Sequence, residues 1–343
     1  MTIAEQQAPA AGAPPSRSEA AGRDTSHPLV RFLRVWGTIL VILLVAVAFS
    51  FASPYFLTVS NINNILFSMF TCALLSMGLT FVVAAGSFDL SIGTIVTTSS
   101  IVCALCIPVL GAPAAIIVAL LVSMLIGLAN GVLVTWFRIS GIVGTIGVMF
   151  LLEGGNQYLT GGYQVAVGYD EHFFRWLGQG RYGFIAVKSV FLFVFFIIAF
   201  IIANRLRIGH YINAVGDNPL AAYYSGIPVY RWVISSFVLS ALFCGIAGIF
   251  LASTSSSAQP TGGAGYLLEA FAAVFLGATI LGKGKPHVLG TLLGVFFLYM
   301  VSNGMTQFGV DSSARNIFNG FVLLAAVGTN ALLNREELHL RFI

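Results

Sequence analysis

The residues of this chain that most strongly indicate a functional site are carboxylates placed inside apolar sequence. Three of them, Asp89, Glu153 and Glu269, lie well inside apolar runs. A charge at membrane depth costs on the order of 2.5–3.5 kcal/mol on insertion scales unless it faces a cavity or a polar partner. Gly86 and Gly93 flank Asp89 and permit an unwound backbone, as in broken helices that line a binding cavity. Asp89 therefore lines a pathway or caps a helix, and the residues alone leave both interpretations open.

A second informative stretch is the polar segment 204–230, which contains the signals of a short, well-bounded helix. Asp217 or Asn218 can serve as the N-cap, and Pro219 suits the first helical position. Gly226 is a natural residue to end the helix, which is predicted over Leu220–Ser225. The sequence thus predicts a short helix lying flat on one face of the protein.

The small side chains of this predicted helix suggest what it does. Ala221 and Ala222 are compatible with insertion into a groove of another protein, and we expect them on the buried face. The alternative is a simple connector between two longer helices. Within the segment itself nothing decides between docking and connection.

Motifs for catalysis are missing from the sequence. The G-K-G-K run at 282–285 lacks the spacing of a phosphate-binding loop, and no H-E-x-x-H, G-x-S-x-G or Asp-rich diphosphate pair is present. Cys103 and Cys106 form a C-x-x-C, but no second pair or nearby His completes a zinc site. We therefore expect no catalytic residue, no metal site and no cofactor bound by this chain.

Composition defines the class of protein that must position these residues. Of 343 residues, 58% are apolar and 8% are charged, whereas soluble chains carry roughly 25% charged residues. So few charges cannot cover a water-exposed surface, which indicates a multi-spanning membrane protein. The net charge of +4 is spread thinly with no basic stripe, so no nucleic-acid partner is expected.

The predicted fold is an all-α polytopic membrane protein with about ten transmembrane helices. Residues 1–34 read as a disordered cytoplasmic tail, 35–333 as the transmembrane domain and 334–343 as a C-terminal tail. A helix break is expected near 86–93. Most of the ten apolar segments approach the roughly 20 residues that cross a bilayer. The ten segments are 35–51, 62–85, 90–110, 114–136, 139–159, 184–203, 231–252, 266–281, 288–306 and 315–333.

Orientation follows from the basic residues. With alternating spans, twelve of the 16 Lys and Arg fall on the side of the N-terminus, which the positive-inside rule places in the cytoplasm. Both termini and segment 204–230 are then cytoplasmic, in a plasma (bacterial inner) membrane. Segment 160–183 lies outside and is rich in aromatics, which indicates either a headgroup-level belt or a docking surface for an external protein.

Three stretches together carry a resemblance to a known family. The segment 78–93, GLTFVVAAGSFDLSIG, resembles the "GxTFVxxxGGIDLSVG" segment of the membrane subunits of ribose-type sugar ABC importers. The segments 214–229 (AVGDNPLAAYYSGIPV) and 263–294 (GAGYLLEAFAAVFLGATILGKGKPHVLGTLLG) resemble two further motifs of that family, in the same order. Ser87 and Phe88 replace the usual Gly-Ile, and Glu269 replaces the commoner Asp, so the particular sugar is not indicated.

The resemblance implies a transporter subunit that is not itself an enzyme. Segment 204–230 would be the coupling loop that seats in a cytoplasmic ABC ATPase, with ATP and Mg bound by that partner. The implied coupling residues are Gly216, Asp217, Asn218, Pro219, Ala221, Ala222 and Gly226. A second permease subunit, identical or not, would form the pathway, and a periplasmic or extracellular solute-binding protein would deliver a monosaccharide. The pathway residues expected here are Phe88, Asp89, Ser91, Glu153 and Glu269.

Three other functions compete with this interpretation. A branched-chain amino acid ABC permease, or one for another small polar solute, resembles the chain more distantly, and the Asp-Leu-Ser stretch fits the sugar importers better. A secondary carrier would need no ATPase and would leave the capped helix without a role. A polyprenyl-type membrane enzyme would need the diphosphate carboxylates that are missing here.

Overall fold

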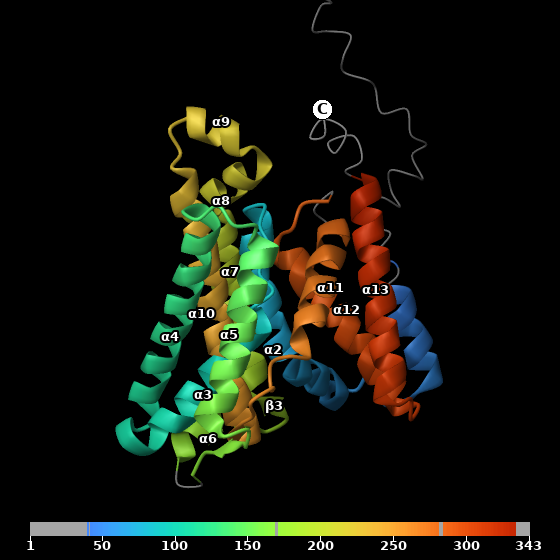
Figure 1. Cartoon of the computed structure of the whole chain (residues 1–343). Coiled ribbons are helices and arrows are strands. Elements are labelled where there is room, and N and C mark those ends of the chain that lie inside the picture. Colours follow the sequence, from blue (N-terminus) through green and yellow to red (C-terminus); the bar gives the residue numbers. More distant parts are fainter. Residues whose placement is uncertain (1–39, 41, 169–170, 281–283, 334–343) are drawn as a thin grey trace, which may run out of the picture.

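The computed structural model describes residues 40, 42–168, 171–280 and 284–333. They form a bundle of long helices joined by short elements (Figure 1). The long helices are α2 (Val59–Ala84), α3 (Ile92–Leu110), α4 (Ala112–Thr135), α5 (Gly141–Thr160), α7 (Val187–Asn204), α10 (Val229–Ser255), α11 (Tyr266–Ile280), α12 (Val288–Gln307) and α13 (Ser312–Leu333). The short elements are α6 (His172–Gln179), α8 (Arg207–Asp217), α9 (Pro219–Tyr224), β1 (Val165–Ala166), β2 (Arg181–Tyr182), β3 (Ile185–Ala186) and β4 (Ser257–Ala258).

The helices confirm the prediction of an all-α multi-pass membrane protein. Among the described residues six helices, α2, α3, α4, α7, α10 and α12, are long and apolar enough to cross a membrane. Ile42–Ala52 and Tyr266–Thr279 are shorter apolar helices, and they overlap the predicted segments 35–51 and 266–281. The count of about ten spans stays a prediction. The predicted tails at 1–34 and 334–343 lie outside the described residues.

Helix α2 is the centre of the bundle because its apolar side chains are buried on nearly every side. Aromatic contacts join it to α10, where the ring centroids of Phe70 and Phe250 are 4.6 Å apart. By contrast, α4 and α7 leave most of their apolar surface exposed, as expected of helices that face lipid. The core thus lies inside the bundle while apolar side chains also cover its outside.

Two helix pairs approach at backbone level. A Cβ added at Gly127 of α4 would overlap the carbonyl oxygen of Phe237 on α10. Gly277 of α11 and Gly290 of α12 are packed backbone against backbone in the same manner. Small residues allow this close approach in membranes, where van der Waals packing drives association. These glycines therefore serve close helix packing.

The short elements gather at the two ends of the bundle. Helices α8 and α9 lie at the end where α13 finishes, here called the α9 end, and α6 lies at the opposite end, here called the α6 end (Figure 1). The structure therefore places segment 204–230 on the same side as the C-terminal end of α13, as the alternating spans predict. Which of these ends faces the cytoplasm stays a prediction.

The α6 end is more ordered than the sequence indicates. Segment 160–183 was expected to be a loop, yet it contains α6, whose Phe174 and Leu177 point into the bundle while Phe173 is exposed. Gln179 anchors this helix by donating to the carbonyl oxygen of Thr254 at 3.0 Å. Strand β1 pairs antiparallel with β4. Helix α6 is short and amphipathic, so a search of the sequence for membrane spans does not detect it. This is why the sequence predicts no helix in this segment.

Candidate functional site

The helix predicted in segment 204–230 is present as α9. Its N-cap is Asn218, whose side-chain oxygen accepts a hydrogen bond from the backbone N–H of Ala221 at 3.0 Å. Pro219 occupies the first helical position. Gly226 follows the helix with φ +80°, a left-handed conformation that glycine adopts without strain. Of the two candidate caps the structure therefore selects Asn218 over Asp217.

The face of α9 that packs inward differs from the prediction. Ala222 is buried within this chain, at 5% exposure, beside Val82, Val215 and Phe237, and Ala221 is exposed. The expectation that both alanines form one face toward another protein is wrong. Consecutive residues of an α-helix point about 100° apart, so Ala221 and Ala222 lie on different sides of α9. The side chains that project from α9 are Leu220, Tyr223 and Tyr224, with exposures of 68%, 66% and 83%.

Helix α8, which the sequence reading missed, holds α9 against the bundle. Its inward residues are Gly209, Ile212 and Val215, a helical spacing that the sequence contains. Gly216, near the end of α8, packs directly on the carbonyl group of Ala84 at the end of α2. The surface formed by α8 and α9 is thus fixed to the central helix of the bundle.

An ion pair joins this surface to a second connection at the α9 end. The Nζ atom of Lys285, in the turn before α12, is 2.6 Å from Oδ1 of Asp217. The two side chains are 68% and 56% exposed, so solvent screens the pair and its contribution to stability is small. Nothing local in the sequence indicates this pairing, because the two residues are 68 positions apart.

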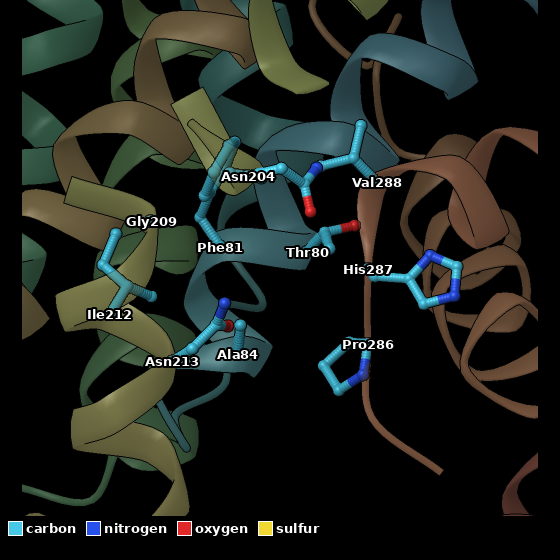
Figure 2. Close-up of a pocket in the computed structure, with 11 residues that line it drawn as sticks. Thr80, Phe81, Ala84, Asn204, Gly209, Ile212, Asn213, Pro286, His287 and Val288 are labelled. Atoms are coloured by element: carbon cyan, nitrogen blue, oxygen red, sulfur yellow. The ribbon is translucent and has the colours of Figure 1, made fainter. Parts of the chain in front are cut away.

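Figure 2 shows the small cavity between this turn, α2, α7 and α8. Thr80, Asn204 and Asn213 contribute polar side chains to its wall, whereas the ring of His287, another lining residue, points away from them (Figure 2). Its volume is about 30 Å³, which holds one or two water molecules and no sugar. His287 also caps α12 by accepting the N–H of Gly290 on Nδ1 at 2.8 Å, and burial lowers the pKa of this histidine below its usual value.

The expected helix break around Asp89 is present, because α2 ends at Ala84 and α3 begins at Ile92. Gly86 has φ +78° and allows the turn. Gly93, however, lies in the first turn of α3, where the absence of a Cβ makes room for the carbonyl oxygen of Gly263. The expectation that Gly93 unwinds the backbone is therefore wrong, since the break closes before it.

Asp89 and Ser91 are both fully buried within this chain. Oδ1 of Asp89 accepts from the backbone N–H of Ser91 at 2.9 Å and from its hydroxyl at 2.6 Å. Asn130 of α4, which sequence reasoning did not single out, donates from Nδ2 to the Ser91 hydroxyl at 2.8 Å. Phe88 is half-buried and stacks on Phe271 of α11 with ring centroids 6.3 Å apart. These contacts tie the break to α4 and α11.

The other two carboxylates lie on different elements. Glu269 of α11 accepts hydrogen bonds from the Tyr299 hydroxyl at 2.8 Å and from Asn319 Nδ2 at 3.2 Å. Glu153 is half-exposed on α5. Asp89, Glu153 and Glu269 have different hydrogen-bond partners, and in the described residues they do not form one cluster of carboxylates. Their place in a pathway stays a prediction.

A larger groove runs along the outside of the bundle between α2 and α7. It has a volume of about 480 Å³, and its walls are almost entirely apolar, including Leu66, Phe193 and Ile197. Such a lining suits lipid chains and not a sugar. In the described part of the chain no three His, Cys, Asp or Glu side chains are grouped to hold a metal ion.

The bundle of apolar helices with a fixed helical surface at one end defines a multi-pass membrane protein. Residues 61–327 match the family described as branched-chain amino acid transport system / permease component. The chain therefore belongs to this family of transport permeases.

Curated relatives are similar over most of the chain. The ribose import permease protein RbsC of Escherichia coli K12 is 36% identical over 292 residues, which cover 84% of this chain and 91% of that protein. RbsC of Bacillus subtilis is 32% identical, covering 88% and 92%. The L-arabinose permease AraH of Azospirillum brasilense is 31% identical, covering 85% and 86%. No solved structure matches the chain.

Proposed function

We propose that this chain is the permease subunit of an ABC importer for a monosaccharide. The observation that carries the proposal is the likeness, over more than four fifths of the chain, to permeases named for ribose and arabinose. The branched-chain amino acid alternative takes its support from the family description, but the relatives named above are sugar permeases. The secondary-carrier alternative is less favoured because it gives no role to the surface of α8 and α9.

The α8–α9 surface is the proposed seat of a cytoplasmic ATPase, which would bind ATP and Mg. Leu220, Tyr223 and Tyr224 offer three large, largely exposed side chains on one short helix, and aromatic anchors of this kind dominate protein interfaces. Within the proposed coupling set, Asn218, Pro219 and Gly226 shape the helix. Gly216 and Ala222 hold it to the bundle, and Asp217 pairs with Lys285.

A second permease subunit, identical or not, is the proposed partner in the membrane. Support comes from α5, which exposes Val143, Phe150 and Leu151 and also carries the half-exposed Glu153. A carboxylate beside apolar side chains is costly against lipid and favours a protein neighbour or an aqueous pathway. An external solute-binding protein would deliver the sugar at the α6 end, where Tyr163, Phe173 and Tyr182 are exposed.

The topology proposed with this function has about ten spans and places both termini in the cytoplasm of a bacterial inner membrane. The positive-inside rule supports it. Single-cysteine labelling in intact cells at segments 160–183 and 253–264 is expected to modify both segments from outside. Protection of both from an impermeant reagent would contradict the topology.

The function is tested by uptake in a host that lacks its own ribose permease. The chain is expressed with the ATPase and binding protein of its own transport system, and labelled ribose uptake is measured with unlabelled ribose, allose, arabinose or leucine as competitors. Competition by a sugar and not by leucine is expected. Uptake that is blocked by leucine alone, or that persists without any ATPase, would contradict the proposal.

ATPase docking is tested with two matched substitutions. Leu220→Asp adds a charge to the exposed face of α9 and should abolish co-purification of the ATPase while leaving the permease in the membrane. Tyr163→Asp makes a comparable change at the α6 end and should leave co-purification intact. Equal retention of the ATPase by both variants would mean that α9 is only a connector.

A further inference from the structure

The buried cluster of Asp89, Ser91 and Asn130 contains an imbalance of hydrogen-bond donors and acceptors. All three side chains have zero exposure in this chain. The cluster links the break between α2 and α3 to the C-terminal part of α4. Polar groups buried to this extent are nearly always paired, so the count of their hydrogens is informative.

The single hydroxyl hydrogen of Ser91 determines the orientation of its neighbours. It points to Oδ1 of Asp89, at an oxygen–oxygen distance of 2.6 Å. The Ser91 oxygen can therefore only accept in its contact with Asn130, which requires the NH₂ end of that amide to face Ser91. Two acceptors remain, Oδ2 of Asp89 and Oδ1 of Asn130. Both are buried and receive no hydrogen bond from the described residues.

No positive side chain balances the carboxyl group among the described residues that face it. The Asn130 amide lies beside it. The other neighbouring groups are the Cys244 thiol of α10, which the Ser240 hydroxyl contacts, and the Thr145 hydroxyl of α5, which accepts from the N–H of Leu90. The N-terminus of α3 favours an anion, but this effect is smaller than the cost of removing a carboxylate from water.

We propose that Asp89 is held as a neutral carboxylic acid, whose Oδ2–H donates to Oδ1 of Asn130. The proton comes from water as the chain folds and stays on Oδ2. The two unpartnered oxygens then bond to each other and close a ring, which runs from the acid to the amide, from the amide to the Ser91 oxygen, and from the Ser91 hydroxyl to Oδ1 of the acid. Asp89 is thus a positioning residue that fastens the helix break to α4.

The first test compares two substitutions at the same position in the full-length purified protein. Asp89→Asn places an NH₂ group where the acid hydrogen lies, so it preserves the ring. We expect its melting temperature to match that of the parent. Asp89→Ala removes the acceptor of the Ser91 hydroxyl and the proposed donor to Asn130 Oδ1, and should lower the melting temperature by several degrees. If Asp89→Asn is as unstable as Asp89→Ala, the ionised form is required and the proposal is wrong.

The second test observes the proton directly. An infrared difference spectrum between the parent and Asp89→Asn should contain the C=O band of a buried, protonated carboxyl group, shifted in heavy water. A carboxylate band in its place would overturn the proposal. Replacing choline by sodium should not change the melting temperature, whereas a sodium stabilisation lost in Asp89→Asn would assign a bound cation instead. These readouts do not depend on sugar transport, so they stand or fall separately from the proposed function.

Discussion

Replacement of Gly216 by alanine is the sharpest probe of how α8 and α9 are attached to the bundle. A Cβ at this position would overlap the carbonyl oxygen of Ala84 and would lie 2.8 Å from its carbonyl carbon. Both atoms are backbone atoms at the end of α2, so no side-chain rotation relieves the contact. The last turn of α8 must therefore move away from α2, and α9 must move with it.

The loss of unfolding free energy can be estimated by comparison with a glycine where an added Cβ would meet no other atom. Overpacking of this kind costs about 1–3 kcal/mol, while alanine gains roughly 0.5–1 kcal/mol over glycine inside a helix. Gly147 in α5 has nothing within 4 Å of an added Cβ, so Gly147→Ala experiences the second effect alone. The propensity gain is similar in both variants, so their difference in unfolding free energy should be about 1–3 kcal/mol.

The assay measures thermal stability in detergent together with uptake and ATPase stimulation. We expect Gly216→Ala to melt below Gly147→Ala and to lose ATPase stimulation while its level in the membrane stays normal. If the two variants have the same stability and the same stimulation, α8 does not depend on this backbone contact, and the reasoning is refuted.

Four further changes probe the α9 end. Asn218→Ala should destabilise α9 by about 1 kcal/mol through loss of the cap, measured by protease sensitivity of the segment, with Asn218→Asp as a control that keeps it. Gly226→Ala should cost roughly 1–2 kcal/mol because of its positive φ, visible as a lower melting temperature. Lys285→Ala should change stability by at most about 1 kcal/mol. A double variant that exchanges the two charges, Lys285→Asp with Asp217→Lys, should recover the stability that Lys285→Ala loses. His287 should make the protein less stable as pH falls below about 6.5, because the unfolded chain takes up a proton that the folded cap rejects; thermal melts of His287→Asn should lack this slope.

Local signals in the sequence predicted local structure well. The Asn-Pro start and the Gly end bound α9 because each acts on backbone groups within four residues. The face of α9 was mispredicted because burial of Ala222 depends on Val82 and Phe237, which are remote in the chain. A six-residue helix has no periodicity from which an inward face can be read.

In the candidate site, too, local features were predictable from the sequence and contacts with remote residues were not. A break at Asp89 follows from Gly86, but the partner that satisfies the break is Asn130, 39 residues beyond Ser91. A single asparagine between two glycines in an apolar helix is most simply interpreted as packing. The contact of Gly216 with Ala84 is equally invisible, because it joins two backbones and involves no side chain that a sequence pattern could show.

The close backbone contacts of α4 with α10 and of α11 with α12 determine how this molecule can deform. Two helices that touch through Gly127 or through Gly277 and Gly290 have no layer of side chains between them that could change rotamer. Neither helix can turn about its own axis without a collision of main-chain atoms. Each pair consequently moves as one rigid body. Any opening of a passage must come from tilting of these pairs against one another, at the interfaces where side chains fill the space between them.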